Sequence, residues 1–190
     1  MIRTLRNSLL TAAIAGLSLP MPLTAQSPIG QILTFVIPSG KFGSNNFTNL
    51  VVNSLAAAKQ FCGALDKSYQ VDCLAERIGA MAGQIPADGD YAEVRSILAK
   101  TSNDMASLAR ANRDGGKPRV SASSGSIQTS RPLTPVSQAS ADATNAKAAA
   151  ILDATTTLLL RTPDDDSGKK LHYARIAEAL GSNKTLLRSA

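Results

Sequence analysis

Two cysteines, Cys62 and Cys73, place the strongest constraint on how this chain folds. They are eleven residues apart, so one unbroken helix would hold them on the same face but about 16 Å apart, at ~1.5 Å per residue. A disulfide requires Cα atoms within about 7 Å of each other. A disulfide and a continuous helix therefore exclude each other, and the pairing state decides whether the chain bends between the two residues.

The start of the chain has the features of a secretory signal peptide. Arg3 and Arg6 form a short basic lead, an apolar run follows at 9–19, and a candidate cleavage site lies after Ala25. The apolar run is shorter than the roughly 20 residues that a membrane-spanning helix needs. We therefore expect residues 1–25 to be removed and the mature chain to be periplasmic or extracellular, without a transmembrane span.

Export decides between the possible roles of the cysteines. In an oxidising compartment the two thiols have a single possible pairing, so we predict a disulfide between Cys62 and Cys73. Gly63 weakens a helix and residues 66–68 favour a turn, which predicts two helices that fold back on each other beside the bridge. A redox site would normally show Cys-x-x-Cys, and a zinc site needs about four ligands, for which the cysteines and His172 do not suffice. We expect no metal and no cofactor.

The rest of the mature chain is dominated by apolar residues at helical spacing. This pattern predicts an all-α fold, a small bundle of four to five helices. The predicted helices run from Phe47 to the corner, from the corner to about Gly83, from a capping box at Asp90 and Glu93 to Gly115 and Gly116, from Ser137 to about Leu160, and from Lys169 to Leu180 with Gly181 as the end. The residues expected to be buried on the last of these are Leu171, Ile176, Ala177 and Leu180.

The domain organisation follows from these helices and from the segments between them. A mature chain of about 165 residues suits one small domain with tails. Residues 26–46 are rich in Gly and Pro and predict an extended lead, whereas the Gly, Ser and Pro content of 114–136 predicts a flexible link. Residues 47–113 would form the disulfide-clasped hairpin and third helix, and 137–190 the C-terminal helices of the same domain.

The charge of the chain is mild but uneven. Of 20 Lys and Arg residues two lie in the signal, which leaves 18 against 14 acids, a net charge of about +4. This is too small a charge to indicate nucleic-acid binding. The most asymmetric part is C-terminal, where one acid, Glu178, accompanies Lys169, Lys170, Arg175, Lys184 and Arg188. These five residues either form a surface for an acidic partner or anionic lipid, or form a solvated face that balances nearby aspartates.

The stretch from Arg175 to Arg188 resembles the helix-turn-helix pattern of bacterial transcription regulators. The matching residues are Ile176, Ala177, Leu180, Gly181, Thr185 and Arg188. That resemblance implies two helices at a fixed angle, the second lying in a DNA major groove. Ser182 stands where the pattern has an apolar residue, and an exported protein does not meet the genome. We therefore interpret the match as an inward-facing Ile/Ala/Leu stripe and expect no nucleic-acid partner.

No catalytic set is recognisable in the sequence. His172 is a potential general base, but no nucleophile or orienting acid stands near it in the pattern, and we expect it to be solvent-exposed or to cap a helix. The sequence therefore favours an exported, non-catalytic structural or interaction module that engages another envelope protein or the envelope surface. The alternative is a small secreted enzyme whose site combines His172 with Tyr173 and a carboxylate.

Overall fold

The computed structural model describes residues 45–88, 91–162 and 168–188. The predicted signal peptide at 1–25, nearly all of the predicted lead at 26–46 and Asp90 of the predicted capping box lie outside these ranges. The first helix, α1 (Asn45–Gly63), begins two residues before the predicted start at Phe47.

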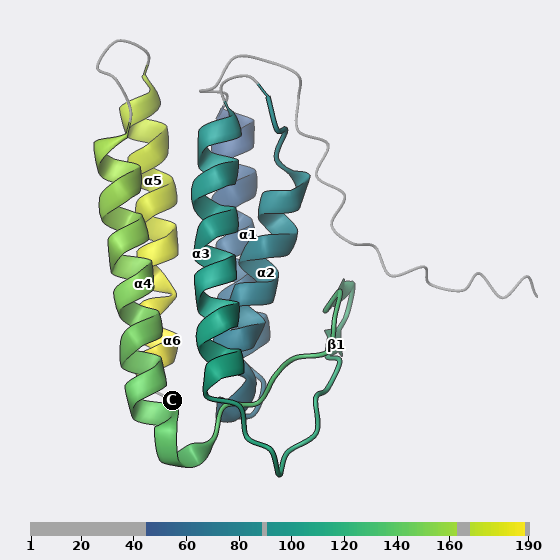
Figure 1. Cartoon of the computed structure of the whole chain (residues 1–190). Helices are drawn as coiled ribbons and strands as arrows, with labels where there is room; N and C mark the ends of the chain where they lie inside the picture. The colour runs from purple at the N-terminus through teal and green to yellow at the C-terminus, as the bar shows by residue number, and fades with distance from the viewer. Residues whose placement is uncertain (1–44, 89–90, 163–167, 189–190) are drawn as a thin grey trace, which may run out of the picture.

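The described residues form a small all-α bundle, as the periodicity predicted. Five long helices alternate in direction, and a short sixth helix follows the fifth along the same column (Figure 1). After α1 these are α2 (Gln70–Gln84), α3 (Ala92–Ala111), α4 (Ala141–Arg161), α5 (Lys169–Ser182) and α6 (Lys184–Arg188). None of the described helices is both long and apolar enough to cross a membrane.

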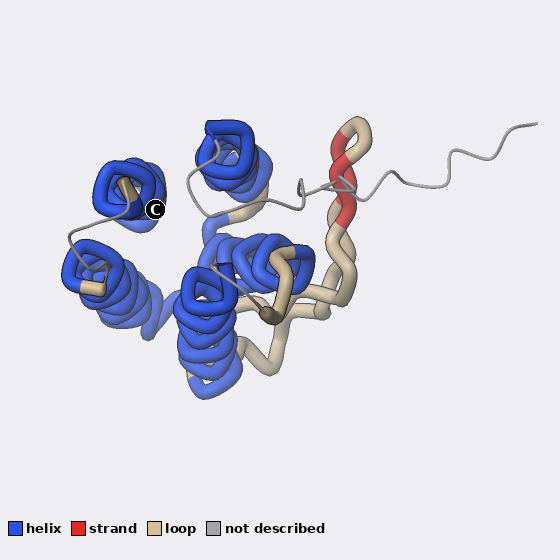
Figure 2. Tube along the Cα trace, turned by 90° about the horizontal axis from the view of Figure 1, so that it is seen from above, coloured by secondary structure: helices blue, strands red, loops and turns tan. Residues whose placement is uncertain are grey.

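The long helices pack side by side in a closed ring. Each helix from α1 to α4 packs against its successor, and α5 packs against both α4 and α1, as the view from above shows (Figure 2). The predicted apolar stripes all face one shared core; Val71, Leu74 and Ile78 of α2, for example, are fully buried. The ring brings the first turn of α1 against α5, which follows it by more than a hundred residues.

The corner between α1 and α2 has the predicted form. Cys62 in the last turn of α1 and Cys73 in the first turn of α2 have Cα atoms 5.6 Å apart and are joined as a disulfide. A single 3-10 turn, η1 (Lys67–Tyr69), makes the reversal, and the Asp66 carboxylate caps it by accepting the backbone N–H of Ser68. The turn-favouring residues between the cysteines therefore break the helix where the sequence indicated.

The segment between α3 and α4 is an irregular excursion with two legs. The pair β1 (Ser123–Ser124) and β2 (Ile127–Gln128) forms its tip, where Gly125 adopts a positive φ of 57°. Isolated antiparallel bridges join Arg113 to Val136 and Val120 to Leu133, and Leu133 is fully buried. The segment predicted as a flexible link, 114–136, lies between α3 and α4; its legs are held on the bundle by specific contacts, and its tip is exposed.

Several helix boundaries differ from those predicted. α3 ends at Ala111, ahead of the two glycines, where Asn112 leaves the helical region with φ −113° and ψ 26° and its side-chain amide donates to the Leu108 carbonyl. A 3-10 turn, η3 (Gln138–Ser140), follows Ser137, so α4 starts only at Ala141. α5 continues through Gly181 to Ser182.

Two predictions on α5 were wrong. Leu171, expected in the core, is 66% exposed, and His172, expected at the surface, is only 8% exposed. The inward face of α5 runs through His172, Tyr173, Ile176, Ala177 and Leu180, so Leu171 falls about 100° away from it at ~3.6 residues per turn. The reason is that α1 supplies a partner for the imidazole, which makes burial of the histidine tolerable.

Candidate functional site

The most distinctive surface feature is a groove along the first half of α4, at the end of the bundle that carries the disulfide. One part, about 460 Å³, lies between α4 and α6. A second part, about 420 Å³, lies between the start of α4 and the η1 corner. Asp142 and Asn145 line both parts. The two hollows therefore adjoin at these residues, and together we call them the α4 groove.

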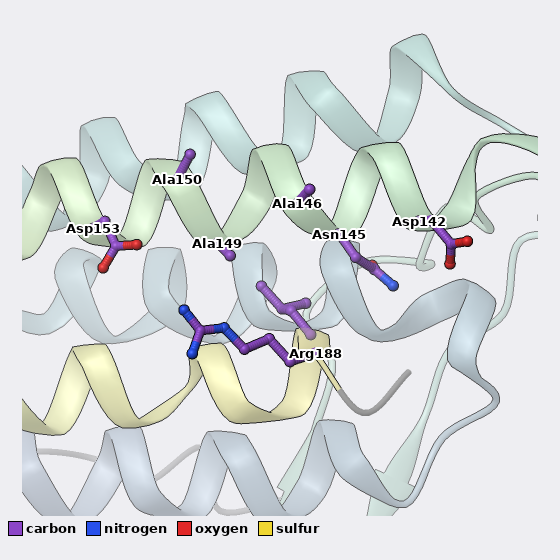
Figure 3. A pocket seen from close by; sticks show the side chains of 8 residues that line it. Asp142, Asn145, Ala146, Ala149, Ala150, Asp153 and Arg188 are labelled. Atoms are coloured by element: carbon purple, nitrogen blue, oxygen red, sulfur yellow. The ribbon is translucent and has the colours of Figure 1, made fainter.

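Asn145 is the unusual residue of this groove. Its side chain extends from α4 on the side that faces α6, between Asp142 and Ala149 (Figure 3). The residue is only 9% exposed, its carboxamide has no hydrogen-bond partner among the residues that the structure describes, and its polar atoms remain accessible to solvent in the groove. An amide that no protein group uses is free to exchange its water for a ligand. The groove thus holds a donor and an acceptor that no described residue uses, where its two parts adjoin.

The two ends of the part between α4 and α6 carry opposite charges. Asp142 lies in the first turn of α4 and Arg188 in the last turn of α6, both exposed and without a partner within the described ranges. Asp153, farther along α4, is paired with Lys184. Ala146, Ala149 and Ala150 line this part between the ends and are its alanine wall; Ala149 is the one that points toward α6 (Figure 3). The free charges that remain for a ligand are therefore one acid and one base.

In the part of the groove beside the corner, the lining side chains are more polar, and several of them already bond to one another. Lys117 from the excursion lies 3.2 Å from the Asp66 carboxylate and also reaches Ser68. Hydrogen bonds from the Ser68 hydroxyl and backbone N–H, with a smaller contribution from Lys117, hold the pKa of Asp66 below its ordinary value. This network fixes the wall opposite Asp142 without drawing on either Asp142 or Asn145.

A third hollow, about 640 Å³, lies between α1 and α6. All of its lining residues are exposed or half-buried, and none presents a buried polar group like Asn145. It is the weaker candidate for a binding site.

The five basic residues predicted as a possible surface do not form one patch. Lys169 and Lys170 begin α5 at one end of the bundle, whereas Lys184 and Arg188 lie on α6, more than the ~21 Å length of α5 away. Arg175 points toward α1, where it donates to the Asn49 side-chain oxygen at 2.7 Å. Of the five, only Arg188 lines the α4 groove.

His172 and Tyr173 point to different neighbours. His172 Nδ1 lies 2.7 Å from the Thr48 hydroxyl on α1, while the Tyr173 hydroxyl donates to the Glu93 carboxylate on α3 at 3.2 Å. Both side chains are buried. The histidine, the tyrosine and the carboxylate of the enzyme hypothesis therefore do not converge on one point, and none of them lines the three hollows described above.

The stretch that resembles a helix-turn-helix packs against the rest of the bundle. Asn183 separates α5 from α6, which has only five residues and lies against α4. Leu187, in the second half of the motif, is buried in the core. Arg188, at the end of this stretch, is exposed and lines the α4 groove.

Sequence reasoning missed two buried carboxylates on α2 that hold the excursion in place. Asp72, fully buried, accepts both guanidinium nitrogens of Arg131 at 2.6 and 2.8 Å and the backbone N–H of Thr134. Glu76 accepts the backbone N–H and hydroxyl of Ser130. Their spacing is the sequence signal that could have revealed them, because Asp72 and Glu76 are four residues apart and lie within the apolar stripe of α2. Their role is structural, because every oxygen has a partner.

No three His, Cys, Asp or Glu side chains of the described segments gather in a way that would hold a metal ion. Comparison with known proteins gives no relative, since no family model, curated protein or solved structure matches the chain significantly.

Proposed function

We propose that this protein is an exported, non-catalytic interaction module that binds an extended peptide segment of a partner protein in the α4 groove. The observation that carries the proposal is the unpartnered carboxamide of Asn145, a mostly covered residue that lines both parts of the groove.

The chemistry of a carboxamide matches that of a peptide backbone. The Asn145 side chain offers one carbonyl acceptor and two N–H donors. A peptide group that lies along the groove presents both a carbonyl and an N–H, so a single backbone unit can satisfy both functions of the amide. Asp142 and Asp153 are eleven residues apart on α4, about 16 Å at ~1.5 Å per residue, which accommodates about five residues of extended chain.

The end charges specify the kind of segment. Asp142 at the start of α4 favours a basic side chain, and Arg188 at the end of α6 favours an acidic side chain or a terminal carboxylate. The preferred ligand therefore carries a base and an acid separated by a few small residues that fit beside the alanine wall.

Export is the other half of the proposal. It is supported by the basic and apolar start of the chain and by a cysteine pair in disulfide geometry, which oxidising compartments favour. Mass spectrometry of the natively purified protein should find a chain that begins near Gln26 and contains no free thiol. An intact leader with two free thiols would rule out this half of the proposal.

The groove is tested by selecting peptides from a phage-displayed random library on the disulfide-bonded protein. Binding of the selected peptides is then measured by calorimetry to the wild type, Asn145→Leu and the control Asn103→Leu, which changes an exposed asparagine of α3 outside the groove. We expect Asn145→Leu to lose about tenfold in affinity, or ~1.4 kcal/mol, and the control to bind like the wild type.

Because the Asn145 amide bonds to no described residue, we expect Asn145→Leu to remain as stable as the wild type. Equal affinity of both variants, or a library that yields no binder, would contradict the proposed function.

A further inference from the structure

The part of the α4 groove beside the corner contains a positive charge that no described residue uses. Lys67, in the η1 turn, lines this part and is exposed. Its ammonium group has no partner among the residues that the structure describes, whereas the other lysine of this part, Lys117, is paired with Asp66. Lys67 is therefore available to an acidic group of a ligand.

The charges of the groove that have no partner within the described ranges alternate in sign. Arg188 lines only the part between α4 and α6, Lys67 lines only the part beside the corner, and Asp142 lines both. Asp142 therefore lies between the two bases along the groove. Figure 3 shows one half of this order, with Asp142 at the start of α4 and Arg188 beside the turns that follow.

Both parts of the groove are large enough to hold side chains of one bound segment. Their volumes, about 460 and 420 Å³, lie within the range of about 300–1,000 Å³ that is usual for ligand pockets. Asn145 lines both parts, so a segment that bonds to its carboxamide lies where the two parts adjoin. The segment can then extend from this point in both directions.

We infer that the partner segment carries a basic side chain with an acidic group on each side of it. The base pairs with Asp142, one acid pairs with Arg188, and the second acid pairs with Lys67. This inference rests on the proposed function of the α4 groove and adds the second acid to it. A segment with this pattern has a net negative charge, which the formal net charge of +6 on the chain attracts at long range.

A uniformly anionic partner, such as a nucleic acid, fits the groove less well. Any chain of anions that reaches from Lys67 to Arg188 passes Asp142, where like charges repel each other. The alternating pattern therefore favours a peptide, in which acidic and basic side chains can follow one another.

The test selects peptides from a phage-displayed random library on the disulfide-bonded wild type, on Lys67→Glu and on the control Lys147→Glu. Lys147 is an exposed lysine of α4 that lines neither part, so the control makes the same change in net charge outside the groove. We expect the wild type and the control to select a base with an acid on each side. Lys67→Glu should select peptides that keep the base and one acid and carry a neutral or basic residue in place of the other acid.

Calorimetry with a synthetic peptide selected on the wild type then identifies the contact. Replacing the second acid of this peptide by its amide should weaken binding to the wild type about threefold, an ordinary value for an exposed ion pair. Lys67→Gln should bind both peptides equally, because the coupling between the two changes isolates the pair. Since the Lys67 side chain has no described partner to lose, thermal unfolding of Lys67→Gln should match that of the wild type.

The outcomes separate this inference from the proposed function. Selected peptides with a base and a single acid, which bind the wild type and Lys67→Glu equally, would overturn the inference and leave the groove as a peptide site. Selected peptides that are uniformly acidic and contain no base would overturn it in favour of a polyanion. A library that yields no binder would contradict both.

Discussion

The hydroxyl oxygen of Thr48 and Nδ1 of His172 lie 2.7 Å apart and share a buried hydrogen bond across 124 residues of sequence. The bond joins the first turn of α1 to the first turn of α5 and so helps to close the ring of helices. Thr48→Val keeps the volume but removes the hydroxyl, which leaves this nitrogen of His172 without its partner. We expect a loss of about 1–3 kcal/mol in the free energy of unfolding, measured by urea denaturation.

Thr157→Val is the matched control, because that exposed hydroxyl bonds only to a carbonyl of its own helix. It should change the stability by no more than about 0.5 kcal/mol. Equal effects of the two substitutions would show that the contact between α1 and α5 does not contribute to stability.

The approach of α2 to α3 depends on Gly79. A Cβ at this position would overlap the Ser102 hydroxyl, which donates to the Ala75 carbonyl at 2.7 Å. We predict that Gly79→Ala destabilises the fold, although alanine normally favours a helix over glycine by about 1 kcal/mol. Gly83→Ala, in the same helix with open space around its Cβ, should be neutral or stabilising. Thermal unfolding of the two variants provides the comparison, and a Gly79→Ala variant as stable as Gly83→Ala would contradict the packing described here.

The Asp66 cap predicts a specific response to acid. Its pKa is lowered chiefly by the Ser68 hydroxyl, then by the Ser68 backbone N–H and by Lys117. Because the pKa is lower in the folded state, the cap stabilises the corner above the ordinary pKa of an aspartate, and this contribution is lost as the pH falls through the folded-state pKa. In an NMR titration of the Asp66 carboxyl carbon, Ser68→Ala should raise the pKa toward its ordinary value and Lys117→Gln should raise it less. The reverse order would contradict the assignment of the main cause.

The excursion between α3 and α4 is anchored by Arg131. Arg131→Met would leave the Asp72 carboxylate buried without its bidentate partner, which we expect to cost about 2–4 kcal/mol, below the full value for a buried pair because a third of the Arg131 side chain is exposed. Arg119→Met, which removes one exposed contact to the Pro132 carbonyl, is the control and should cost no more than about 0.5 kcal/mol. Urea denaturation measures both, and equal losses would rule out the anchor.

The helices and the corner could be predicted because their signals are local. Apolar residues such as Leu74 and Ile78 recur at the helical period within one segment, and the turn residues between Cys62 and Cys73 lie where the chain must bend. The side of α5 that faces the core could not be predicted in the same way. Leu171 and His172 are neighbours, and which of them faces inward is decided by Thr48, a residue far away in the chain.

The candidate site could not be predicted from local sequence patterns. Asn145 lies in an alanine-rich helix, where the sequence alone predicts an exposed position for a single amide. In the fold the residue is mostly covered, and α6 packs against α4. Arg188 and Asp142 are 46 residues apart and become the two ends of one groove only through that packing. Asp72 and Arg131 are likewise unrelated until the excursion folds back onto α2.

The central claim is that the Asn145 carboxamide is an unused recognition group. The most direct measurement is the ¹H–¹⁵N NMR signal of its side-chain NH₂ during titration with a peptide selected on the protein. The account predicts that the Asn145 signal shifts and that its protons exchange more slowly with water at saturation, while the signal of the exposed Asn103 amide does not move. An Asn145 signal that stays unchanged while the peptide binds would contradict it.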